Sequence, residues 1–125
     1  QQHVPDLENV MFWAAQRMGR GSSVVFVVDE PYPPEFRVWG IDEFDLGVEY
    51  HGVPAEEMDS TDFRALCGTT TCRVFFLPEN ADDVLAQLHA QLGEGSVQTH
   101  VNREGQPIGL EFVPRALEGD APASE

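Results

Sequence analysis

The chain of 125 residues is 42% hydrophobic and carries 22 acidic residues against seven basic ones, a net charge of −15. All seven basic residues are Arg, because the sequence contains no Lys. A charge of this sign disfavours direct binding to nucleic acid and to anionic membranes, and it favours basic protein surfaces or cations. No apolar run approaches the roughly 18 residues that span a bilayer. We therefore expect a soluble protein without a membrane segment. The compartment is undetermined, with the cytoplasm slightly favoured.

The first 28 residues predict one helix and one strand. Within residues 5–18 the apolar side chains recur at helical spacing and form a single stripe, Leu7, Val10, Met11, Ala14 and Met18. Residues 23–28 are almost entirely β-branched or aromatic. A run of this kind is typical of a strand covered on both faces, so we expect it in the middle of a sheet.

Residues 29–51 predict a proline-rich loop followed by two strands. The three prolines within residues 29–34 withdraw backbone donors and keep the chain out of a sheet. Residues 36–41 predict the next strand. Residues 42–51 alternate with a period of two, with Phe44, Leu46, Val48 and Tyr50 on a buried face and Glu43, Asp45 and Glu49 on an exposed one. The two strands could instead be one long strand that bends at Gly40.

The second half begins with an ambiguous segment and a strand. Residues 54–66 predict either a short helix from about residue 60 or two broken turns, because Pro54 and the acids after it favour a helix start while residues 59–62 offer a competing cap. Residues 72–77 are apolar apart from Arg73 and predict a strand that ends at Pro78.

A helix and a hairpin complete the chain. We expect Asn80 to cap a helix with an apolar stripe that ends at Gly93. Residues 97–101 and 108–112 alternate on either side of a turn, which predicts a β-hairpin.

This order of elements predicts an α+β fold: a mostly antiparallel sheet of five to six strands, with two main helices packed on one face. We expect residues 1–114 to form a single domain. Residues 115–125 are rich in Ala, Gly, Pro, Ser and acid, and we expect them to form a disordered acidic tail.

The segment from Cys67 to Arg73 has two interpretations. Its Cys-x5-Arg spacing equals that of a cysteine-phosphatase cradle, where a thiolate attacks phosphorus while an Arg and backbone amides hold the phosphate oxygens. That cradle leads into a helix, whereas residues 74–77 predict a strand. In the second interpretation Cys67 and Cys72 are structural, either as a disulfide across a turn or as two small half-buried thiols. We favour structural cysteines.

His51 and His100 fall on the exposed sides of their predicted strands. With Glu49 they could bind a metal ion if those two strands were neighbours. Exposed histidines that bind nothing are far commoner, so we expect no metal and no cofactor.

The acids are concentrated between Asp29 and Asp62, where eleven acids stand against one base, Arg37. Aromatic residues interleave with them, and charge combined with aromatic anchors is typical of protein interfaces. The predicted partner-binding residues are Tyr32, Glu35, Trp39, Glu43, Asp45, Glu49 and Tyr50. An alternative is that this region is only the solvated face of an acidic protein.

The sequence thus favours a non-enzymatic acidic binding module of the inhibitor, immunity-like or nucleic-acid-mimic type. Its expected partner is a basic protein surface, with no direct binding to nucleic acid or to membranes. The alternative function is a cysteine-dependent phosphatase-like enzyme that uses the loop from Cys67 to Arg73.

Overall fold

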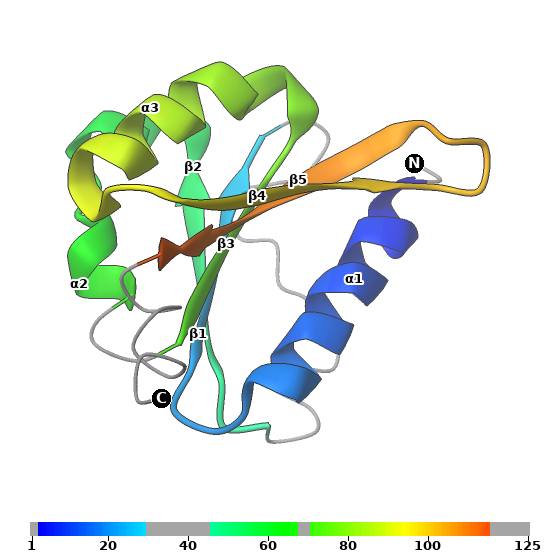
Figure 1. The fold of residues 1–125 in the computed structure, drawn as a ribbon, viewed down its shortest axis with the longest axis horizontal. Helices are drawn as coiled ribbons and strands as arrows, with labels where there is room; N and C mark the ends of the chain where they lie inside the picture. The colour runs from blue at the N-terminus through cyan, green and yellow to red at the C-terminus, as the bar shows by residue number, and fades with distance from the viewer. Residues whose placement is uncertain (1–2, 30–45, 68–70, 116–125) are drawn as a thin grey trace.

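A computed structural model describes residues 3–29, 46–67 and 71–115 of the chain. The elements follow in the order α1 (His3–Met18), β1 (Ser23–Val28), β2 (Glu49–Pro54), the 3-10 helix η1 (Ala55–Ser60), α2 (Phe63–Cys67), β3 (Cys72–Phe76), the 3-10 helix η2 (Pro78–Asn80), α3 (Ala81–Leu92), β4 (Gly95–Val101) and β5 (Pro107–Pro114). Figure 1 shows these elements along the chain. Among the described residues, no helix combines the length and apolar character that crossing a membrane requires.

The described strands form one five-stranded sheet in the order β2-β1-β3-β5-β4. β1 pairs in parallel with both β2 and β3, while β5 pairs antiparallel with β3 and with β4. The α+β class and a five-stranded sheet are confirmed. The prediction of a mostly antiparallel sheet is wrong, because the sheet is mixed. The parallel pairs arise because the chain returns to the same end of the sheet before it enters β2 and again before it enters β3.

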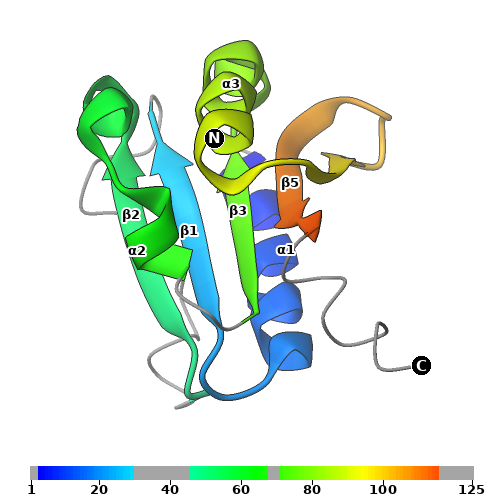
Figure 2. The same ribbon diagram turned by 60° about the vertical axis from the view of Figure 1, so that its left-hand side comes forward.

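Helices cover both faces of the sheet, so the prediction of helices on one face is also wrong. α1 lies behind the sheet in Figure 2, and α2 and α3 lie in front of it. The physical reason lies in β1, whose six residues are all buried. Val24, Phe26 and Val28 join the core under α1, whereas Val25 and Val27 join the core under α2 and α3. A strand that is apolar on both faces needs a cover on each.

The predicted acidic strand is shorter at its start than its alternation suggested. Within its described part, residues 46–48 lie outside the strand, and β2 begins at Glu49 and continues to Pro54. Gly47 has a φ of +74°, a conformation that few other residues adopt, and its carbonyl accepts a hydrogen bond from the Gly21 amide. The turn at Gly47 therefore places β2 beside β1. The predicted strand at residues 36–41 and the bend at Gly40 lie outside the described residues.

The other local predictions are largely confirmed. Residues 54–66 contain elements of both predicted alternatives, because the short 3-10 helix η1 is followed by a short α-helix, α2, that begins at Phe63. α3 and the hairpin of β4 and β5 occur where expected, although Asn80 precedes α3 without capping it through its side chain. η2 ends at Asn80 and leads directly into α3. The predicted acidic tail lies outside the described residues, apart from its first residue, Arg115.

α1 packs against β5 through a close approach at Gly109. A Cβ atom at this position would lie 2.6 Å from Leu7 Cδ1, and Leu7 is fully buried.

We predict that Gly109→Ala lowers the free energy of unfolding by about 2 kcal/mol through overpacking, and that Leu7→Ala lowers it by about 3 kcal/mol through a cavity. In the double variant the added methyl group occupies part of the space that Leu7 vacates. Urea unfolding should therefore show a smaller loss of unfolding free energy than the sum of the two single-variant losses. Strict additivity would contradict this packing.

Candidate functional site

Two of the seven predicted partner-binding residues are described, and they differ in accessibility. Glu49 opens β2, its side chain is 74% exposed, and its Oε1 lies 3.2 Å from His51 Nε2. Tyr50 is half-buried and packs against the core under α1, as the alternation predicted. The other five, Tyr32, Glu35, Trp39, Glu43 and Asp45, lie outside the described residues. Glu49 is therefore the accessible described member of the predicted set.

Exposed acids continue beyond Glu49 in the segments that follow β2. We call the five exposed acids between residues 46 and 63 the acidic surface: Glu49, Glu56, Glu57, Asp59 and Asp62. No Arg occurs in this stretch. β2 is the outer strand of the described sheet on this side, and η1 and α2 follow it. The strand separates Glu49 from the start of η1 by about 17 Å. The acids thus extend from the start of β2 to the start of α2, a span long enough for another protein to contact.

Hydrogen bonds to α3 hold the acidic surface in place. Asp59 Oδ1 accepts from Gln87 Nε2 at 2.9 Å. Gln91 accepts from the Phe63 amide at 2.7 Å and donates to the Thr61 carbonyl at 3.0 Å, so its side chain connects α3 to the link between η1 and α2. Asp62 Oδ1 accepts from the Ala65 amide at 3.2 Å at the start of α2. Because these carboxylates sit on anchored backbone, they present negative charge at defined positions.

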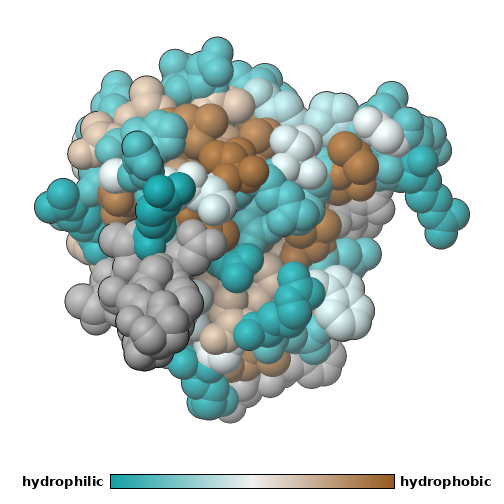
Figure 3. Space-filling model, viewed as in Figure 1, coloured by the Kyte–Doolittle hydropathy of each residue, from teal (hydrophilic) through white to brown (hydrophobic). Residues whose placement is uncertain are grey.

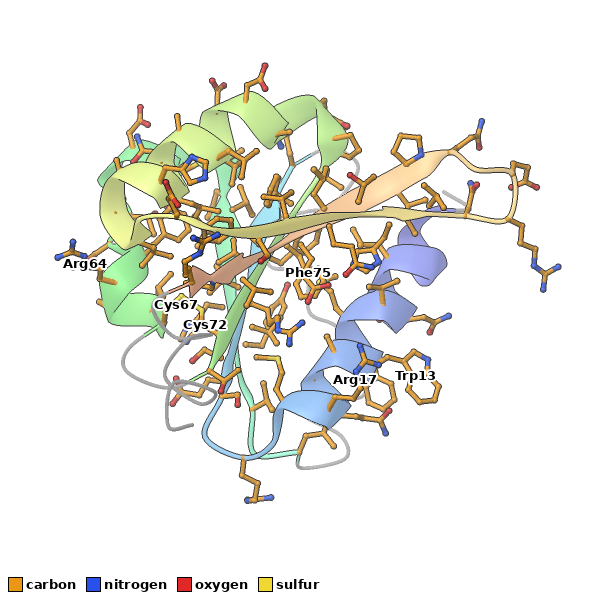
Figure 4. All side chains as sticks on the ribbon, in the orientation of Figure 1. Trp13, Arg17, Arg64, Cys67, Cys72 and Phe75 are labelled. Atoms are coloured by element: carbon orange, nitrogen blue, oxygen red, sulfur yellow. A yellow bond between two sulfur atoms is a disulfide. The ribbon has the colours of Figure 1, made fainter. Side chains whose placement is uncertain are left out.

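Cys67 and Cys72 form a disulfide, with their Cα atoms 5.3 Å apart. Figure 4 shows the pair where the end of α2 meets the start of β3. Both cysteines are buried and belong to the core under α2 and α3. This arrangement agrees with the prediction that the two cysteines are structural, and it corresponds to the disulfide alternative.

The same geometry gives the phosphatase alternative no support. A disulfide-bonded sulfur is not a thiolate nucleophile. Arg73 follows Cys72 in β3, and successive strand residues point to opposite faces of the sheet. The Arg73 guanidinium pairs with Glu111 rather than facing the sulfur of Cys67. α2 also precedes the segment, whereas the cradle requires a helix after it.

A charged cluster that the sequence interpretation missed lies on the α1 side of the sheet. Glu111, in β5, is only 4% exposed, and its two oxygens have separate partners. His100 Nε2 in β4 lies 2.8 Å from Oε1, and a terminal nitrogen of Arg73 in β3 donates to Oε2. The His100 ring stacks on Phe75, with ring centroids 6.4 Å apart. Three adjacent strands therefore meet at one carboxylate.

The partners of Glu111 control its ionisation. Burial raises the pKa of the Glu111 carboxyl, but hydrogen bonds from His100 and Arg73, together with attraction to Arg73, outweigh burial and leave the pKa below its ordinary value of 4.5. Glu111 is therefore ionised at neutral pH, and its charge is compensated inside the protein. The one signal in the sequence was an acid between Leu110 and Phe112, in a strand that is otherwise apolar.

The suggested metal site of Glu49, His51 and His100 does not form. β2 and β4 lie at opposite edges of the described sheet, with three strands between them. His51 pairs with Glu49, while His100 pairs with Glu111. Within residues 3–29, 46–67 and 71–115, no group of three or more His, Cys, Asp or Glu is arranged to hold a metal ion.

The chain matches no protein-family model, no curated protein and no solved structure at a significant level.

Glu111→Gln should destabilise the protein in a pH-dependent manner. The folded-state pKa of Glu111 is lowered, so the stability that its ionisation supplies is present above pH 4.5 and is lost as the pH falls through the folded-state value. Removing the charge at pH 7 leaves the Arg73 guanidinium without its counter-charge and should cost about 3 kcal/mol. Urea unfolding from pH 7 to pH 3 should show the variant and the wild type converging in acid. The exposed Glu104→Gln is the matched control, and a constant difference across this range would refute the role of the charge.

The disulfide should stabilise the fold moderately, because it closes a short loop with a sequence separation of five residues. The double variant Cys67→Ala, Cys72→Ala should lose about 2 kcal/mol of unfolding free energy. Reductant should lower the stability of the wild type by a similar amount and leave the variant unchanged. Equal sensitivity of both proteins to reductant would show that the loss has another origin.

Proposed function

We propose that the chain is a non-enzymatic acidic protein-binding module of the inhibitor, immunity-like or nucleic-acid-mimic type, which engages a basic protein surface through the acidic surface. One observation carries the proposal: all five acids between residues 46 and 63 are exposed on β2, on η1 and just before α2, without an Arg among them. The residues Tyr32, Glu35, Trp39, Glu43 and Asp45, which precede these acids in the chain, extend the proposed site with further acids and aromatic anchors.

The charge of the whole chain supports the same partner class. A net charge of −15 draws a basic protein towards the chain over a distance, and the local concentration of acids orients it. Like-charged partners are repelled by the same field. Association should therefore be fast and strongly dependent on salt.

The anchoring of the acids favours recognition of a defined partner over general attraction. Asp59 and Asp62 accept hydrogen bonds within the protein, so part of the ordering entropy is already lost before a partner binds. Exposed carboxylates can also imitate a row of phosphates, which would let the module occupy a nucleic-acid-binding groove.

The test compares two triple variants that remove the same charge. Glu49→Gln, Glu56→Gln, Glu57→Gln neutralises the acidic surface, whereas Glu79→Gln, Asp83→Asn, Glu104→Gln neutralises exposed acids elsewhere. With a basic partner captured from the native extract and then purified, we expect the first variant to associate about tenfold more slowly at low salt. The second variant should remain close to wild type.

The outcomes separate local recognition from general charge. Equal effects of the two triple variants would attribute binding to net charge alone and would refute the acidic surface. If the wild type and both triple variants all capture the partner at high salt, the interface is an apolar surface and not the acidic surface.

A further inference from the structure

The outer edge of β4 differs from the acidic surface in its charge. Residues 95–102 contain neither an acid nor an Arg. Residues 94–115, which include the hairpin, contain three acids and two arginines, a net charge of −1, so the remainder of the chain carries −14. Val97 and Val101 are 43% and 54% exposed. In Figure 1 the hairpin projects beyond α1, and in Figure 3 brown apolar atoms occur along it among teal ones.

β4 also presents backbone hydrogen-bonding groups at its outer edge. It is the last strand of the described sheet on this side. The Glu94 carbonyl accepts from the Arg115 amide and so faces the β5 side. Because successive residues of an antiparallel strand face opposite edges, Val97 and Thr99 direct their N–H and C=O groups away from β5. Such an edge is a template for a further strand.

We propose that this edge binds a second copy of the chain, with the two β4 strands paired antiparallel about a twofold axis at Gln98. Val97 of each copy then lies opposite Thr99 of the other, and both residues contribute outward-facing backbone groups. The register irregularity between His100 and Val101 ends the regular part of the edge, which contains both Val97 and Thr99. An isologous pair of this kind closes as a dimer.

Electrostatics favours a second copy at this edge over other edges and over a basic partner. Two chains of charge −15 repel each other least where charge is absent, which is the β4 edge. β2 lies at the opposite edge of the sheet, so pairing through β4 keeps the two acidic surfaces far apart. Residues 95–102 contain no acid with which a basic partner would pair.

The pairing predicts a particular response to salt and concentration. One strand pair covers less than the roughly 1,200 Å² of small specific interfaces, so the dimer should depend on protein concentration. Salt screens the repulsion between the two acidic chains and should increase the dimer fraction. This response is opposite to that of the proposed basic partner, whose binding weakens with salt, so each proposal can fail without the other.

Sedimentation equilibrium of the whole chain at low and high sodium chloride tests the dimer. Val97→Glu places a negative charge on the edge of each copy and should weaken dimerisation about tenfold. Thr99→Pro removes an outward N–H and leaves the pairing with β5, and it should also abolish the dimer. A monomer at every concentration and salt level, or a dimer that both variants retain, would overturn the proposal.

A crosslink tests the register independently of these variants. Opposed residues in a non-hydrogen-bonded antiparallel pair have Cα atoms about 4.5 Å apart, which is within the range for a disulfide. Gln98→Cys should therefore form a covalent dimer under mild oxidation much faster than Gln106→Cys, an exposed position in the turn. Equal rates for the two variants would refute pairing at Gln98.

Discussion

Burial of β1 on both faces is the constraint on which the rest of the fold depends. Its alternate side chains enter two separate cores, one under α1 and one under α2 and α3. Each core must be closed by an amphipathic element, and β2 and β3 pair in parallel on either side of β1. The hydrophobic gain from Phe26 alone is about 2 kcal/mol. Because a one-residue shift of β1 would exchange its two faces, its register is strongly specified.

The cluster around Glu111 plays a comparable role where the sheet changes from parallel to antiparallel pairing. β3, β5 and β4 each contribute one charged or titratable side chain, and a slip of any strand would move its side chain to the opposite face. A buried ion pair contributes little net stability compared with apolar residues, but breaking it is costly. We therefore interpret Arg73, His100 and Glu111 mainly as a device that specifies strand register.

Charge is distributed unequally between the two edges of the sheet. β2 and the segments that follow it carry the acidic surface, whereas residues 94–115, which include the other edge strand, are close to neutral. An edge strand with charged side chains is protected against pairing with other strands, and an uncharged one is not. The proposed basic partner and the proposed second copy use these opposite properties, so one chain could engage both at once.

Local patterns in the sequence were sufficient to predict most of the helices and strands. The apolar stripes of α1 and α3, the buried run of β1 and the alternation of the closing hairpin each depend on residues close in the chain. The disulfide was one of two alternatives that the cysteine spacing allowed. The partners of each strand, the cover on both faces and the burial of Glu111 between His100 and Arg73 were decided only by the tertiary structure. Those features join residues far apart in the chain, and periodicity within one segment carries no information about which other segment will pair with it.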